Sequence, residues 1–229
     1  MTYSGKDDGS DDEPQVWIYA DNDFEQNYKI SNQGRTIQYH DLKSKLTIEE
    51  KEMKGPDLYG HYDLYGTWIQ HITPLQPSSE TTKSFKTKVI TVGEGLISYK
   101  NTGIEIGLAS KLDSNQKTLP EWKELGCHYN FLNGAICHRL KYPMDIVDRG
   151  EPDDIIEWTI SCPDENGEQI EAILKINGEE KGEHLFLKGG KDLFPTLHIG
   201  SPGAKVESGF HFIEPKTGNG KSENFVHII

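Results

Sequence analysis

The sequence lacks several features that would place it in familiar classes. It has no run of 18 apolar residues, which excludes a transmembrane helix. Residues 1–13 have no apolar stretch of the kind that a signal peptide needs, so we expect no secretion leader in this sequence. A mature form whose leader has been removed would look the same. No Asn-x-Ser/Thr glycosylation site is present.

Cysteine is scarce. Cys127, Cys137 and Cys162 are odd in number, and their spacing matches no metal-binding pattern. We therefore expect a protein without metal or cofactor, from a reducing compartment such as the cytoplasm or the nucleus.

Positive charge is in deficit. The chain of 229 residues carries 24 Lys and Arg against 37 Asp and Glu, a net charge of -13. So acidic a surface repels phosphate groups, and we expect no binding to nucleic acid or to membranes.

Helical patterns are also rare, and only Leu46–Met53 resembles a short helix. Short runs instead alternate β-branched or aromatic residues with polar ones, and Gly-rich turns separate them. Two hairpins are indicated, around Asn32–Arg35 and around 163–168. We expect strands at residues 16–19, 28–31, 36–39, 85–92, 103–108, 155–160, 170–176, 194–199, 206–212 and 224–229. This pattern predicts an all-β, antiparallel sandwich or barrel behind a disordered acidic tail, residues 1–13.

Several motifs occur in the order found in the SPRY domain family. The chain resembles that family at Gly95–Ser98 with Ile104–Ala109 (I-G-L-A), Leu119–Lys123 with Tyr129 and Asn133-Gly134 (L-P-x-W and a loop), Asp153–Ile156 (D-x-I), Leu174–Gly178 (K-x-N-G), Leu193–Thr196 (L-x-P-T) and Ser201–Glu207 (P-G-x-K-V-E). The last two are also similar to SPRY effectors of plant-parasitic nematodes. Three departures stand out: Cys127 replaces a tyrosine, Phe131–Asn133 replaces a polar loop, and Gly209–Phe212 replaces N-F-G.

The resemblance implies a bent antiparallel β-sandwich of the concanavalin-type jelly-roll kind with at most one short helix. Residues 14–229 would form one such domain, with variable strands in 14–79, the SPRY core in 83–212 and a last strand in 213–229. It implies no catalytic chemistry. Loops at one edge would capture a peptide or a partner protein, as in an adaptor, and we expect a monomer.

Seven residues are candidates for partner contact. Tyr62, Tyr65 and Trp68 form an aromatic-rich segment typical of binding hot spots, although packing explains Trp68 equally well. Trp122 is interpreted first as a core or loop-anchoring residue. The resemblance places Tyr129 on the binding surface. Phe131 and Leu132 would add an apolar patch if their loop is exposed, and the alternative is that the loop folds down and buries them.

Two other functions compete with this hypothesis. A lectin-like sandwich could stack sugar rings on Tyr62, Tyr65 and Trp68. An enzyme is disfavoured, because His128 and His138 each follow a cysteine directly and neighbours along a strand point to opposite faces. His61, Asp63 and His71 fit no zinc spacing, and 164–167 lacks the ligands of a calcium loop.

Overall fold

The computed structural model describes eleven parts of the chain: residues 15–19, 27–40, 68–76, 78, 81–93, 103–111, 126–138, 141–163, 167–188, 192–201 and 203–213. The acidic tail, the expected helix Leu46–Met53 and the expected strand 224–229 lie outside these residues. Within them there is no α-helix, and hence no helix that could cross a membrane.

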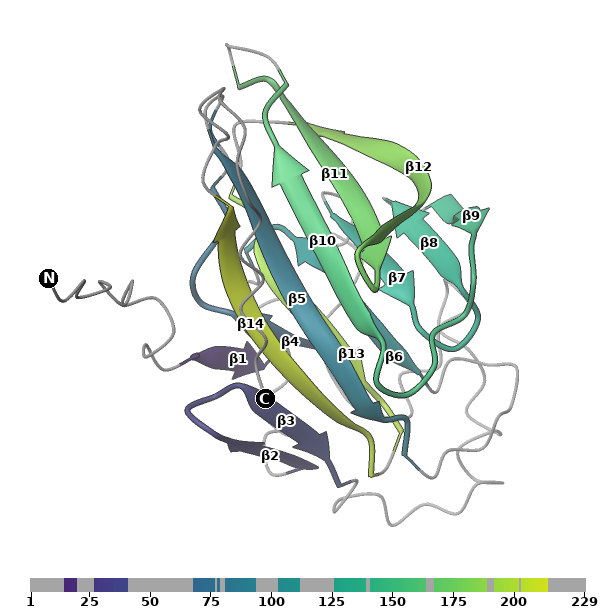
Figure 1. Cartoon of the computed structure of the whole chain (residues 1–229). Coiled ribbons are helices and arrows are strands. Elements are labelled where there is room, and N and C mark those ends of the chain that lie inside the picture. Colours follow the sequence, from purple (N-terminus) through teal and green to yellow (C-terminus); the bar gives the residue numbers. More distant parts are fainter. Residues whose placement is uncertain are drawn as a thin grey trace, which may run out of the picture.

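The described residues form two seven-stranded antiparallel sheets (Figure 1). The first sheet has the order β1 (Trp17–Tyr19), β4 (Trp68–His71), β13 (Phe194–Ile199), β6 (Ile104–Ala109), β7 (Cys127–Asn130), β8 (Ala135–His138) and β9 (Lys141–Ile146). The second has the order β12 (Glu179–Lys188), β11 (Gln169–Ile176), β10 (Ile155–Ser161), β5 (Thr82–Thr91), β14 (Lys205–Ile213), β3 (Thr36–Tyr39) and β2 (Tyr28–Ser31). The sandwich expected from the sequence is confirmed.

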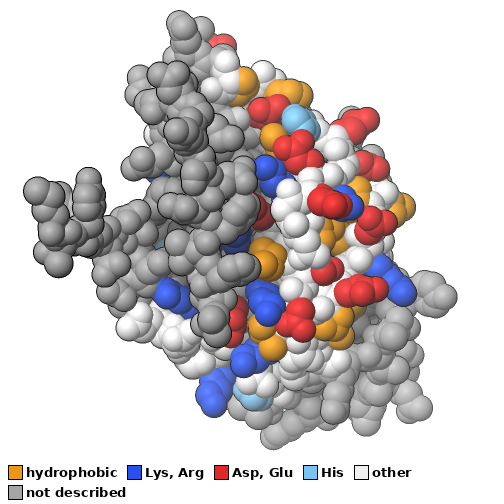
Figure 2. All heavy atoms as spheres, viewed as in Figure 1, with side chains coloured by type: hydrophobic (Ala, Val, Ile, Leu, Met, Phe, Trp, Pro, Cys, Tyr) orange, Lys and Arg blue, Asp and Glu red, His pale blue; other side chains and the backbone are white. Residues whose placement is uncertain are grey.

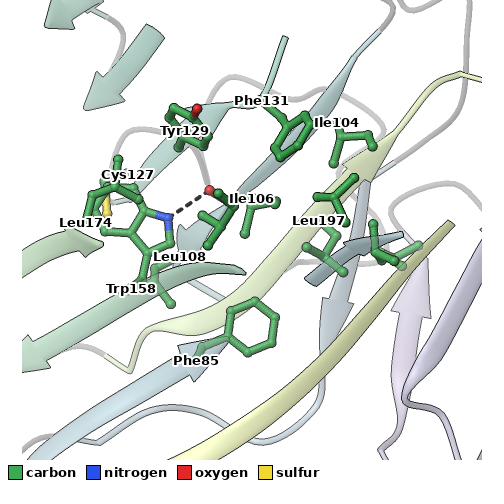
Figure 3. Close-up of a cluster of buried hydrophobic side chains, with 14 of the residues drawn as sticks. Phe85, Ile104, Ile106, Leu108, Cys127, Tyr129, Phe131, Trp158, Leu174 and Leu197 are labelled. Carbon is green, nitrogen blue, oxygen red and sulfur yellow. Dashed lines mark hydrogen bonds between the residues drawn. The ribbon is translucent and has the colours of Figure 1, made fainter. Parts of the chain in front are cut away.

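The core lies between the two sheets and contains the side chains that alternate inward. On β11, buried residues alternate with partly exposed ones from Ile170 to Ile176, as a strand with one covered face requires. Trp158 of β10 is opposite Leu174 on one side and Phe85 on the other, and its side chain is fully buried. Its indole N–H donates to the Ile106 carbonyl of the first sheet at 2.8 Å, so this residue links the two layers (Figure 3).

The hairpin expected at Asn32–Arg35 is confirmed, with Ser31 opposite Thr36. Asn32 and Gln33 both have positive φ, which matches the right-handed twist of the flanking strands. The hairpin of β10 and β11 is also confirmed by the register of the two strands, from Ile156 opposite Ile176 to Ser161 opposite Glu171.

Two segments that the sequence suggested were loops are strands. Trp68 begins β4, and Tyr129 lies inside β7. Every residue of both strands is buried, so neither shows the polar–apolar alternation by which a half-exposed strand is found. The strands β8, β9 and β12 were not expected either.

Trp158→Ala should lower the free energy of unfolding by about 3–5 kcal/mol, because it empties the centre of the core. Ile155→Ala in the same strand should cost no more than about 0.5 kcal/mol, the usual size of a surface effect, since Ile155 is 41% exposed. Urea denaturation of both variants measures the two costs. Equal losses would show that the strand faces are assigned wrongly.

Candidate functional site

At one end of the sandwich, the segment of residues 147–154 leads from β9 in the first sheet to β10 in the second (Figure 1). Its side chains at Asp148, Arg149, Glu151, Pro152 and Asp153 are exposed. We call these five residues, together with Leu132 and Ile146, the loop edge.

The first half of the segment is bonded to the turn between β7 and β8. The amide of Val147 donates to the Gly134 carbonyl at 2.9 Å, and that of Gly150 donates to the Phe131 carbonyl at 2.8 Å. The hydroxyl of Tyr129 donates to the backbone carbonyl of Asp148 at 2.7 Å. Burial raises the pKa of Tyr129, and nearby carboxylates raise it further, so the hydroxyl stays protonated and able to donate.

The ring of Phe131 lies directly under this segment. Its side chain is 0% exposed, and a Cβ added to Gly150 would overlap the ring. The Tyr129 ring stands nearly perpendicular to it, with the ring centres 6.5 Å apart. Figure 3 shows both rings among the buried core side chains.

These positions correct two expectations. Phe131 is not an exposed loop residue, and Tyr129 does not lie on an open binding surface, since both are 0% exposed. The loop lies over the core because backbone hydrogen bonds hold it there. The amide of Phe131, for example, donates to the Ile104 carbonyl at 2.9 Å. Leu132, the neighbour, points outward and is 36% exposed. The two rings support the loop edge from below.

The second half of the segment is bonded to β5 and to the β11–β12 turn. Val89 accepts from the amide of Asp153 and donates to the carbonyl of Asp154. The Asp154 carboxylate accepts from the amide of Glu151 at 2.7 Å and from the Asn177 side chain at 2.7 Å. Asp153 and Asn177 both have positive φ, a conformation that these two residue types tolerate better than most. Both halves of the segment are thus held at several points.

The charged side chains of the loop edge are three carboxylates and one guanidinium group, and one aliphatic residue is strongly exposed. Asp148 pairs with Lys181 at 3.3 Å, and Asp153 pairs with Lys88 at 3.0 Å. Ile146, at the end of β9, is 67% exposed. The loop edge therefore presents charge and apolar surface together.

Trp68 occupies a different place, on the outer face of the first sheet. Its ring lies 5.7 Å from the ring of His128 and 5.2 Å from that of His198. His128 contacts the Glu105 carboxylate at 3.6 Å. Trp68 is only 5% exposed, and the cavity beside it, about 10 Å³, has room for one water molecule. Trp68 therefore offers no open ring face to a ligand.

The remaining candidates, Tyr62, Tyr65 and Trp122, lie outside the described residues. Of the four candidates that the structure describes, only Leu132 is on the loop edge. Ile146, Asp148, Glu151 and Asp153 were missed. The charged, Gly- and Pro-containing run from 147 to 154 was the available signal, since such runs are typical of exposed connections.

The cysteines show an arrangement that spacing along the chain did not reveal. Cys127 is opposite His138, and Cys137 is opposite His128, across the β7–β8 pair. Both thiols are buried, and burial raises the pKa of Cys127 strongly, which suppresses the reactive thiolate. Within the described residues, no three His, Cys, Asp or Glu side chains are grouped so as to hold a metal ion.

Comparison with known proteins identifies the fold. Sequence comparison finds no matching family model and no matching curated protein. A human SPRY domain of known structure is similar to the chain, with a TM-score of 0.53 and 15% identity over 80% of this chain and 94% of that one. The TRIM65 PSpry domain has a TM-score of 0.49 and 6% identity, covering 86% of this chain and 89% of its own. A peanut lectin crystallised with a nine-residue peptide has a TM-score of 0.47 and 9% identity, covering 92% and 95%. The chain has a divergent SPRY-like fold.

Phe131→Ala and Leu132→Ala should differ sharply although the residues are adjacent. Removing the buried Phe131 ring should cost about 3–5 kcal/mol of unfolding free energy, whereas removing the exposed Leu132 should cost under about 1 kcal/mol. Urea denaturation followed by tryptophan fluorescence compares the two variants. A loss of unfolding free energy for Phe131→Ala as small as that for Leu132→Ala would show that the Phe131 ring is exposed.

Thiol titration tests the burial of the cysteines. In the native protein only Cys162, which is partly exposed, should react promptly with a chromogenic disulfide, and all three thiols should react after denaturation. A native thiol at Cys127 or Cys137 that reacts faster than Cys162, identified by peptide mass mapping, would contradict the burial and reopen a catalytic interpretation.

Proposed function

We propose that the chain is a non-catalytic protein-interaction module that captures a peptide or a partner protein through the loop edge. The observation that carries this proposal is the 147–154 segment, which is exposed in its side chains and bonded along its backbone to both sheets. Exposed loops on a rigid frame are the usual place of binding residues.

The rigidity of the segment favours binding. Ordering a flexible loop during association costs free energy that reduces affinity. Here the segment is already held by Tyr129, Phe131, Val89 and Asn177, so a partner meets a surface whose backbone is fixed by folding. A modest contact area then gives useful affinity.

The apolar residues of the loop edge supply the anchor that such a surface needs. Ile146 pairs with Ala135 at the end of the first sheet, and its side chain extends into solvent. Leu132 lies in the turn whose last residue, Gly134, bonds to Val147. An apolar centre with a polar rim is the common composition of protein interfaces. The SPRY-like fold supports the same function.

A lectin-like function is the second candidate, and the described residues favour it less. Of the three rings considered for sugar stacking, only Trp68 is described, and it is buried against His128 and His198. Stacking on a sugar requires an exposed ring face.

A comparison of captured proteins tests the proposal. Immobilised wild type, the double variant Leu132→Ser with Ile146→Ser, and Phe186→Ser would be exposed to the same cell extract, with retained proteins quantified by mass spectrometry. Phe186, on β12, is 48% exposed and serves as a control in which an exposed apolar side chain away from the loop edge is replaced by serine. All three proteins should have nearly equal melting temperatures.

We expect a set of proteins retained by the wild type and by Phe186→Ser to fall at least fivefold with the double variant, since anchor residues dominate binding energy. Retention of the same proteins by all three would place binding elsewhere and contradict the proposal.

A further inference from the structure

We propose that the loop edge selects a basic partner: a segment with Lys or Arg side chains around one aliphatic or aromatic residue. This inference rests on the proposed function and specifies the chemistry of the partner.

The charge balance of the loop edge supports a cationic partner. The segment carries four carboxylates, Asp148, Glu151, Asp153 and Asp154, against one cation, Arg149. The lysines that approach it are already in contact with carboxylates: Lys88 pairs with Asp153, and Lys181 is shared between Asp148 and Glu179. Among the described residues, the five carboxylates of this group, which include Glu179, still outnumber the three cations Arg149, Lys88 and Lys181.

Most of these carboxylates are accessible to a partner, whereas Asp154 is half-buried and accepts from Glu151 and Asn177. The side chains of Asp148, Asp153 and Glu179 are 81%, 74% and 77% exposed. Exposed charges steer association and determine which partner is accepted more than they add to affinity. The net charge of -13 acts over longer distances in the same sense.

The outer face of the second sheet has a different charge pattern. In Figure 2, acidic and basic side chains are interspersed over this face. Lys86 pairs with Glu157, and Lys175 pairs with Glu180, so charges of the two signs neutralise one another there. A cationic partner therefore gains less on that face than at the loop edge.

The exposed Ile146 indicates that the partner carries an apolar side chain in addition to its positive charges. Ile146 is two residues before Asp148 and 67% exposed, so a partner side chain that covers it brings its neighbouring cations close to the acidic segment. Covering Ile146 removes apolar surface from water, which contributes affinity that salt does not screen.

Selection from a random peptide library displayed on phage tests the inference. The bait is the whole chain, and peptides enriched on the wild type but not on Leu132→Ser with Ile146→Ser are taken as loop-edge ligands. The best of them is synthesised with a fluorescent label, and its dissociation constant is measured by anisotropy at low and physiological salt.

Three variants that each change one charge give the decisive comparison. Glu151→Gln and Arg149→Gln alter the loop edge with opposite signs. Asp192→Asn is the matched control, because it removes one charge ahead of β13, at the opposite end of the sandwich, and keeps the oxygen that accepts from Gln76 at 2.8 Å.

If the partner is basic, the selected peptides have net positive charge and one large apolar residue. Glu151→Gln should weaken binding by about two- to fivefold, Arg149→Gln should strengthen it, and Asp192→Asn should leave it unchanged.

Three other results would overturn the inference. Acidic or neutral loop-edge peptides, with the signs of the two variants reversed or absent, contradict the basic partner and leave the proposed function intact. Equal weakening by Glu151→Gln and Asp192→Asn shows general attraction to an acidic protein. Failure to find any peptide that depends on Leu132 and Ile146 contradicts the proposed function as well.

Discussion

The packing of the Phe131 ring against the backbone of Gly150 is the constraint on which the loop edge depends. The ring is fixed from the side of the first sheet, because the amide of Phe131 bonds to Ile104 and its carbonyl accepts from Gly150. No side chain fits at position 150 without overlapping the ring. The course of the 147–154 segment is thereby set by the core, and both halves of this connection between the two sheets are anchored.

This arrangement separates the residues that give the loop edge its shape from those that give it chemistry. Tyr129, Phe131 and the hydrogen-bonding side chains of Asp154 and Asn177 hold the backbone. The side chains of Asp148, Glu151 and Ile146 extend into solvent and can change with little effect on folding. The segment loses its conformational entropy when the protein folds, so partner binding does not have to order it and loses no affinity in that way. A binding preference can therefore evolve on this surface while the fold stays the same.

The sequence predicted some strands and missed others, and burial alone does not separate the two groups. β10, β11 and the fully buried β6 were found from their composition and turn signals. β4 and β7, which are also buried along their whole length, were interpreted as loops, and β8, β9 and β12 were not expected. Phe131 was misplaced because a single sequence does not reveal on which side of a turn a ring lies. The residues that anchor the 147–154 segment, such as Val89 and Asn177, are far from it in the sequence. Its rigidity therefore depends on how the strands pair, which amino-acid composition does not reveal.

Residue-resolved amide hydrogen exchange tests most directly whether the loop edge is a preformed surface. The amides of Val147, Gly150 and Asp153 donate to carbonyls of the β7–β8 turn and of β5. We expect these three amides to exchange within about tenfold of the amides in the central strand β10, since opening of the segment requires disruption of the core beneath it. Exchange of all three at the rate of an unfolded chain, while β10 stays protected, would contradict a rigid loop edge.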